Sequence, residues 1–338
     1  MSHGKNKHKW IRHVAFVSLP FLLFAADIAT GASGLGVGEV FKAITGGEVT
    51  EETRTIVIDI RLMKALTAAL AGTALSLSGL MMQTLFQNPL AGPYVLGVSS
   101  GASLGAAVYV LGASSLAISV GDSALGTLGL AGAAWIGTAL TLLAIAVAGR
   151  RVKDIMVILI LGMTLGSGID ACVQVLQYLS DENALKSYVI WTMGSLSMVS
   201  GTRMWILAAS TLSGLALAAL SVKRLNLLLL GENYAVTMGM DPKRTRRVIL
   251  IATVLLAGTA TAFCGPLGFI GLAVPHICRS LTGEADHGVL IPACVSLGAS
   301  LTLACDILAK NAALPINAVT SLSGIPVVIW IVIKYRNS

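Results

Sequence analysis

Long apolar runs separated by short polar segments extend over the whole chain. A helix needs about 20 apolar residues to cross the hydrocarbon core of a bilayer, and these runs approach or exceed that length. We count ten, at residues 14–30, 62–84, 93–111, 125–148, 154–178, 203–222, 246–264, 268–282, 288–309 and 319–334. Their hydrophobicity does not alternate with a period of two, which argues against a transmembrane barrel. We therefore predict an all-α, polytopic integral membrane helical bundle that forms one transmembrane domain over residues 1–338.

The composition supports a chain that faces lipid. Hydrophobic residues make up 55% of the sequence and charged residues only 12%, with a mean hydropathy of +0.84. Soluble domains usually contain about 25% charged residues. A chain this apolar cannot hide its side chains in one soluble core, so we expect membrane lipid as a constant partner.

Lysine and arginine are concentrated on one predicted side of the membrane. Sixteen of the 23 lysine and arginine residues lie in the basic tail at residues 1–13, in the C-terminal tail or in the junctions after even-numbered runs. Segments rich in these residues stay in the cytoplasm, so both termini are expected there. The net charge of +7 follows from this placement, and no nucleic acid is expected as a partner. A cleaved signal peptide remains an alternative for the first run.

The sequence has no arrangement of residues typical of an enzyme. The five cysteines lie in or beside apolar runs without a CxxC pair, and His276 with Cys278 is too small a set for a metal site. No GxxxxGK[ST] motif is present to hold a nucleotide. We therefore predict a non-catalytic chain with no cofactor and no metal.

Prolines and small residues mark the passage from the second run to the third. Proline disfavours helix in the residue before it, so Asn88 and Pro89 should end the second run, and Pro93 should open the third. Three glycines then recur every four residues and should leave one helix face bare for close packing, namely Gly97, Gly101 and Gly105. Three serines in the same stretch would instead add polar groups facing a pathway, namely Ser99, Ser100 and Ser103.

A polar stretch at residues 226–242 lies between basic clusters and should be cytoplasmic. We expect two short helices, at 227–230 and 232–238, with Gly231 between them. Asp241 and Pro242 are suited to start the next span as its N-cap and first residue. The exposed leucine, tyrosine and methionine side chains predict a protein partner, with a helix on the lipid surface as the alternative.

Charged residues inside apolar runs are costly and need a reason. Asp306 and Lys310 are four residues apart on the ninth run and should form an ion pair near the outer surface. Asp170, with Gln174, is expected to face the interior of the bundle.

Three ordered motifs resemble the FecCD family of permeases, which includes the vitamin B12 importer permease. They are an NPLA-x-P…LG-x-x-x-GA segment at 88–102, a GP-x-GF-x-GL-x-x-PH-x-x-R segment at 265–279 and an LGE…A-x-x-LG segment at 230–239. In the last, Met238 stands where leucine is usual. The resemblance extends from about residue 60 to the C-terminus.

The resemblance implies a type II ABC importer permease in the bacterial cytoplasmic (inner) membrane. Such a chain has ten spans and pairs with a second copy as a homodimer, and the substrate passes along the interface. Two ATP-binding cassette ATPase subunits would bind below and a periplasmic or surface substrate-binding protein above. The substrate would be a metal chelate, and ferric siderophore, haem and cobalamin remain open, as does pairing with a paralogous permease.

The resemblance also implies roles for individual residues. ATPase coupling would involve Leu230, Gly231, Glu232, Tyr234, Ala235, Met238 and Gly239. The binding protein would dock on Arg61, Lys64 and Lys310, although lysine loses the bidentate pairing that arginine offers a carboxylate. The translocation path and inner gate would include Asn88, Pro89, Ser99, Ser100, Gly101, Arg150, Arg151, Asp170 and Gln174.

Two other functions are compatible with parts of the sequence. An ion-coupled secondary transporter would use Asp170 as its coupling carboxylate. A membrane-embedded scaffold would transport nothing and would not stimulate a partner ATPase.

Overall fold

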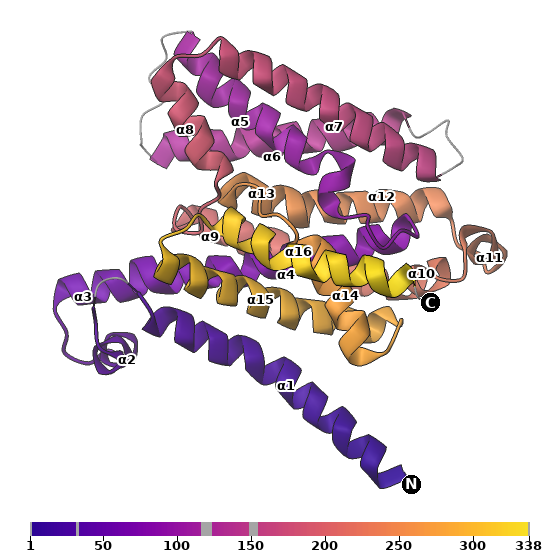
Figure 1. Cartoon of the computed structure of the whole chain (residues 1–338), viewed down its shortest axis with the longest axis horizontal. Coiled ribbons are helices and arrows are strands. Elements are labelled where there is room, and N and C mark those ends of the chain that lie inside the picture. The colour runs from indigo at the N-terminus through magenta and orange to yellow at the C-terminus, as the bar shows by residue number, and fades with distance from the viewer. Residues whose placement is uncertain (1, 32–33, 116–123, 149–154, 337–338) are drawn as a thin grey trace.

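The computed structural model describes residues 2–31, 34–115, 124–148 and 155–336, and these form a helical bundle (Figure 1). Every regular element in these ranges is helical, which confirms the predicted fold class. In the view of Figure 1, α5 (Val98–Ser115), α6 (Ala124–Ala148) and α7 (Ile155–Tyr178) form the upper part. Helices α1 (Ser2–Ala29) and α15 (His287–Ala312) form the lower part.

Nine of the ten apolar runs form long helices. Besides the five above, these are α4 (Met63–Leu85), α9 (Thr202–Leu220), α16 (Ile316–Arg336) and α12 (Pro242–Thr253), which continues through η4 (Val254–Gly258) into α13 (Thr259–Cys264). Within the described ranges, six helices are long and apolar enough to cross a membrane. Shorter apolar stretches lie on the other three helices, at Phe16–Ala29, Val98–Gly112 and Ile316–Trp330.

The eighth apolar run forms only a short helix, α14 (Ile270–Thr282), of 13 residues. At 1.5 Å per residue it is about 20 Å long. The hydrocarbon core is about 30 Å thick, so α14 is too short to cross it. Pro275 lies inside α14 and does not interrupt the helix. The break falls instead at residues 265–269, which are not helical.

Helix α4 is the central helix of the bundle, and every residue from 71 to 85 is buried. It packs against α14 and α15, and a side chain at Gly79 would overlap the carbonyl oxygen of Gly271. Pro275 has no N–H to donate to that oxygen four residues back. The Gly271 carbonyl is therefore available where the two backbones meet. Small residues thus allow close helix packing here.

Four short elements are not indicated by the apolar pattern: α2 (Val37–Thr45), α3 (Glu51–Thr55), the π-helix η1 (Ile56–Leu62) that leads into α4, and α8 (Glu182–Thr192). Two of them have capping residues that the sequence does show. The Thr50 side chain accepts a hydrogen bond from the first turn of α3, and the Asp181 side chain does the same for α8. Each of these elements is too short to register as a span by itself.

The two ends of the bundle differ. In Figure 1, α2, α3 and α8 lie at the left end, while α10 (Val222–Leu228) and α11 (Glu232–Thr237) lie at the right end. The start of α1 and the end of α16 also lie at the right end. Residues 2–13 continue α1 as helix instead of forming a separate tail.

Candidate functional site

The polar segment between α9 and α12 folds as the two short helices α10 and α11. Gly231 and Gly239 have φ angles of 99° and 82°, a conformation that glycine adopts without strain, and they bound α11. The prediction of two helices is confirmed. The first, however, is placed wrongly, because α10 covers Val222–Leu228 instead of 227–230.

Helix α12 starts as the sequence predicts. The Asp241 carboxylate accepts hydrogen bonds from the N–H groups of Lys243 (2.9 Å) and Arg244 (3.2 Å), and Pro242 is the first helical residue. An N-cap carboxylate satisfies donors that the helix itself cannot. This cap fixes where the α10–α11 segment ends.

Large apolar side chains on the α10–α11 segment are exposed. Leu230 is 63% exposed, Tyr234 49% and Met238 60%, and Leu229 and Val236 are also exposed. Ala235 is fully buried and anchors α11. Exposed apolar surface of this kind is typical of contact with a protein or with a membrane. We call these five exposed residues the coupling surface, after the role that the resemblance predicts for this segment.

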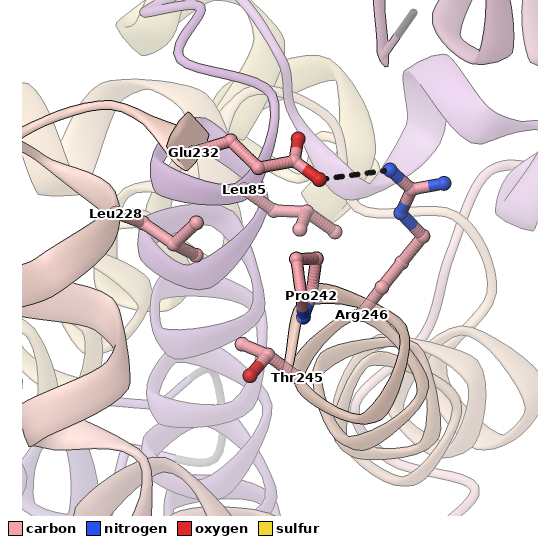
Figure 2. Close-up of a pocket in the computed structure, with 6 residues that line it drawn as sticks. All are labelled: Leu85, Leu228, Glu232, Pro242, Thr245 and Arg246. Atoms are coloured by element: carbon pink, nitrogen blue, oxygen red, sulfur yellow. Dashed lines mark ion pairs between the residues drawn. The ribbon is translucent and has the colours of Figure 1, made fainter. Parts of the chain in front are cut away.

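A small pocket lies where α4, α10, α11 and α12 meet (Figure 2). Its lining comes from the end of α4, from α10 and α11 and from the start of α12, and consists of Leu85, Leu228, Glu232, Pro242, Thr245 and Arg246. The carboxylate of Glu232 and the guanidinium of Arg246 are 3.9 Å apart across it, as Figure 2 shows. This ion pair links α11 to α12.

The predicted turn after α4 is present at Asn88 and Pro89. The side-chain oxygen of Asn88 accepts a hydrogen bond from the Leu90 N–H (2.9 Å), and the Pro89 carbonyl accepts one from His276 Nε2 (2.7 Å). Pro93 opens a short 3-10 turn, η2 (Pro93–Leu96), and α5 follows. The turn is thus fastened to α14.

The glycines of the third run have two different roles. Gly101 and Gly105 face α6, and a side chain at either would overlap that helix. Gly97 is not part of the predicted helix face, because it adopts a left-handed φ of 70° before α5 begins, although a side chain there would also meet Thr141 of α6 (3.2 Å). Ser99 and Ser100 are half-buried, and Ser100 points toward Gly166 of α7.

The predicted interior placement of Asp170 and Gln174 is wrong for the isolated chain. Both are exposed on α7, in line with the exposed Thr164 and Ser167 at spacings of three or four residues. These four residues form a polar stripe on one side of an otherwise apolar span. Arg150 and Arg151, the predicted gate residues, lie outside the described residues.

The predicted docking cations take part in contacts inside the chain. Arg61 is buried and donates hydrogen bonds to the carbonyls of Ile28 (3.0 Å) and Ala29 (3.2 Å). Lys64 lies 3.0 Å from one oxygen of Asp306, and Lys310 lies 2.9 Å from the other. The Asp306–Lys310 pair is therefore confirmed. Docking on these cations stays a prediction.

Asp27 is the member of this charge network that sequence reasoning missed. Its carboxylate lies 2.8 Å from the ammonium of Lys310. An acidic residue near the end of the first apolar run was the available signal, because an unpaired charge is costly there. Within the described residues, no group of three or more histidine, cysteine or acidic side chains is placed to hold a metal.

The chain is similar to known transport proteins over nearly its whole length. Residues 19–334 match the FecCD transport family. The vitamin B12 import system permease protein BtuC of Klebsiella pneumoniae is 34% identical over 336 residues, which cover 98% of this chain and 96% of that protein. The hemin transport system permease protein HmuU of Yersinia pestis is 32% identical, and the match covers 93% of this chain and 94% of that protein.

A solved structure has the same fold. It is described as an inward-facing conformation of a metal-chelate type ABC transporter, and it matches with a TM-score of 0.82 at 27% identity. The match covers 95% of this chain and 98% of the other.

Proposed function

This chain belongs to the FecCD transport family, and we propose that it is the permease subunit of a metal-chelate ABC importer, powered by a separate ATPase. The coupling surface is the observation that supports a separate motor subunit. Its apolar side chains are exposed on a polar loop between two spans, where a soluble protein partner can cover them. Both ends of the chain and this surface would face the cytoplasm.

In this proposal, α11 receives the movement of the ATPase. Tyr234 and Met238 would fill apolar recesses of the partner, while Gly231 and Gly239 allow the backbone turns on either side of α11. The Glu232–Arg246 pair would then pass the displacement to α12. Together with Leu230 and Ala235, these residues are the coupling residues we propose.

The polar stripe on α7 supports a homodimer. An aspartate facing lipid at the centre of a span costs on the order of 2.5–3.5 kcal/mol by insertion scales. A second copy placed against α7 would remove Asp170 and Gln174 from lipid. A water-filled path between the two copies would then be lined by these side chains, with Ser99 and Ser100 on the neighbouring helix.

The substrate proposal rests on the relatives. One is named for vitamin B12 and another for hemin, which are both large metal chelates. We therefore expect cobalamin, haem or a ferric siderophore as cargo, delivered by a binding protein at the end that holds α2, α3 and α8.

Reconstitution into liposomes tests this function. The permease, its ATPase and its binding protein would be combined, and uptake of cyanocobalamin, haemin and a ferric siderophore compared with and without ATP. We expect one chelate to accumulate only with ATP. Uptake that persists without ATP and requires a proton or sodium gradient would instead establish the secondary transporter, and Asp170→Asn would then abolish it.

A further inference from the structure

The last turn of α4 is joined by hydrogen bonds to three other elements. Gln83 accepts a bond from Arg279 (2.5 Å) and donates one to the Leu272 carbonyl (3.1 Å), both on α14. Gln87, just beyond the helix, donates to the Leu228 carbonyl at the end of α10 (2.9 Å). The end of α4 therefore lies at a junction with α14 and the α10–α11 segment.

His287, the first residue of α15, provides a second and fully buried connection at this junction. Its Nε2 lies 2.8 Å from the hydroxyl of Thr84 on α4, and its Nδ1 lies 2.8 Å from Oδ1 of Asn226 on α10. The ring has no exposed surface. It therefore bridges α10 and the central helix α4 by direct contacts.

The Asn226 side chain is held in one orientation, because its oxygen contacts hydrogen-bond donors and its amide nitrogen contacts an acceptor. Its oxygen also accepts the backbone N–H of His287 (2.9 Å), and its amide donates to the Asp286 carboxylate (2.6 Å). The Asp286 carboxylate also accepts a hydrogen bond from the N–H of Gly288. The bond from Gly288, and after it the bond from Asn226, lowers the pKa of Asp286 below its ordinary value. The carboxylate is therefore ionised at neutral pH, and Asn226 cannot turn over without losing two bonds.

These constraints determine which atoms of the bridge donate a hydrogen and which accept one. Because Asn226 presents an oxygen to the ring, Nδ1 of His287 must donate, so Nε2 of the neutral ring accepts from Thr84. The Thr84 hydroxyl also lies 3.0 Å from the Leu80 carbonyl, which competes for its single hydrogen. Apolar contacts can slide past one another, but this chain of buried bonds cannot shift without leaving a polar group unpaired.

We propose that His287 is a positioning residue that transmits movement of α10 to the end of α4 and so to the Asn88–Pro89 turn. The proposal rests on the proposed function, because α10 and α11 form the segment on which the ATPase would act. A push on this segment would displace Asn226 and, through the imidazole, Thr84. The Asn88–Pro89 turn, which leads toward α5, begins four residues after Thr84.

Thr84→Val removes the hydroxyl while keeping the shape of the side chain. In the reconstituted importer we expect the ATPase to remain bound and active, while chelate uptake per ATP hydrolysed falls by about tenfold, the effect of one lost buried hydrogen bond. His287→Gln, which keeps a donor or acceptor near the Nε2 position but loses the Nδ1 bond, should have the same effect. Thr84→Ser should restore coupling.

Thr67→Val is the matched control. Thr67 is buried on the same helix and donates to the carbonyl four residues back (Met63, 2.7 Å), as Thr84 can to Leu80. We expect Thr67→Val to leave uptake per ATP unchanged. Equal coupling in Thr84→Val and Thr67→Val would overturn the proposal.

A second measurement does not depend on transport. In the isolated permease, hydrogen–deuterium exchange should rise in both residues 80–90 and residues 222–231 after either Thr84→Val or Asn226→Ala. If each variant loosens only its own helix, the bridge does not link them and the proposal is wrong. Failure of ATP-driven uptake in the wild-type importer would instead count against the proposed function alone.

Discussion

The ammonium of Lys310 on α15 lies 2.8 Å from the carboxylate of Asp27 on α1, which is 283 positions away in the sequence. Asp306 joins Lys310 to Lys64 at the start of α4, so three helices meet in one network of two carboxylates and two ammonium groups. Both carboxylates are almost fully buried. Each charge is therefore compensated mainly by the others and not by water.

Replacing Lys310 should destabilise the bundle. Lys310→Met leaves Asp27 with no ammonium partner and Asp306 with only Lys64, and breaking a buried ion pair typically costs about 3–5 kcal/mol. The midpoint of thermal unfolding in detergent would measure the loss. Lys186→Met, at an exposed position on α8, is the control and should change the midpoint little. Equal midpoints for the two variants would contradict an integral role of the network.

Truncating the coupling surface should weaken ATPase binding. Tyr234→Ala removes an exposed aromatic side chain, and aromatic anchors at interfaces typically contribute about 2–4 kcal/mol, equivalent to roughly 30-fold or more in affinity. The affinity of the purified permease for its ATPase would be measured with one of the two proteins immobilised on a sensor. Leu143→Ala, which truncates an exposed apolar residue of α6, should have no effect. If Tyr234→Ala binds as tightly as Leu143→Ala, the ATPase contacts another surface.

The stripe on α7 should be close to its copy in the second subunit. Cys172 is exposed on the same helix and would be replaced by alanine, while the other four cysteines are buried. Gln174→Cys then provides the one exposed cysteine among the described residues, and it should form a cross-linked dimer with a short bis-maleimide. Gel electrophoresis would reveal the dimer. Val157→Cys, near the other end of α7, tests whether any exposed position reacts. A monomeric Gln174→Cys in membranes would argue against the homodimer.

Adding one methyl group at Gly79 should disturb the core. A Cβ there would overlap the Gly271 carbonyl, so we expect Gly79→Ala to cost about 1–3 kcal/mol through overpacking. Gly132→Ala on α6 meets nothing within 4 Å and should instead stabilise the helix by up to about 1 kcal/mol. Unfolding of the two variants should therefore shift in opposite directions. A stabilised Gly79→Ala would mean that α4 and α14 can move apart.

Local features of the sequence predicted most of the fold. Apolar runs give the long helices because lipid requires apolar side chains and internal backbone bonding. Asp241 and Pro242 predicted the start of α12 because capping depends on neighbouring residues alone. The short helices α2, α3 and α8 were missed because none of them contains an apolar run long enough to mark a span.

Features that depend on distant residues were not accessible in the same way. The i, i+4 pair of Asp306 and Lys310 follows from helix geometry, whereas Asp27 joins it only through the packing of α1 on α15. Similarly, periodicity places Asp170 and Gln174 on one face of α7 but does not say which face the rest of the chain covers. The His287 bridge needs three helices in place and has no signature within any of them.

The burial of α4 has a consequence for how the protein is made. Ser76 and Thr73 donate to carbonyls of Cys294 (2.8 Å) and Val295 (3.3 Å), yet α15 leaves the ribosome about 200 residues after α4. At roughly 5–20 residues per second, that interval is on the order of 10–40 s. During biogenesis, the Ser76 and Thr73 hydroxyls therefore lie in the membrane or its insertion machinery without their acceptors on α15. They gain these acceptors only after the second half of the chain has been synthesised.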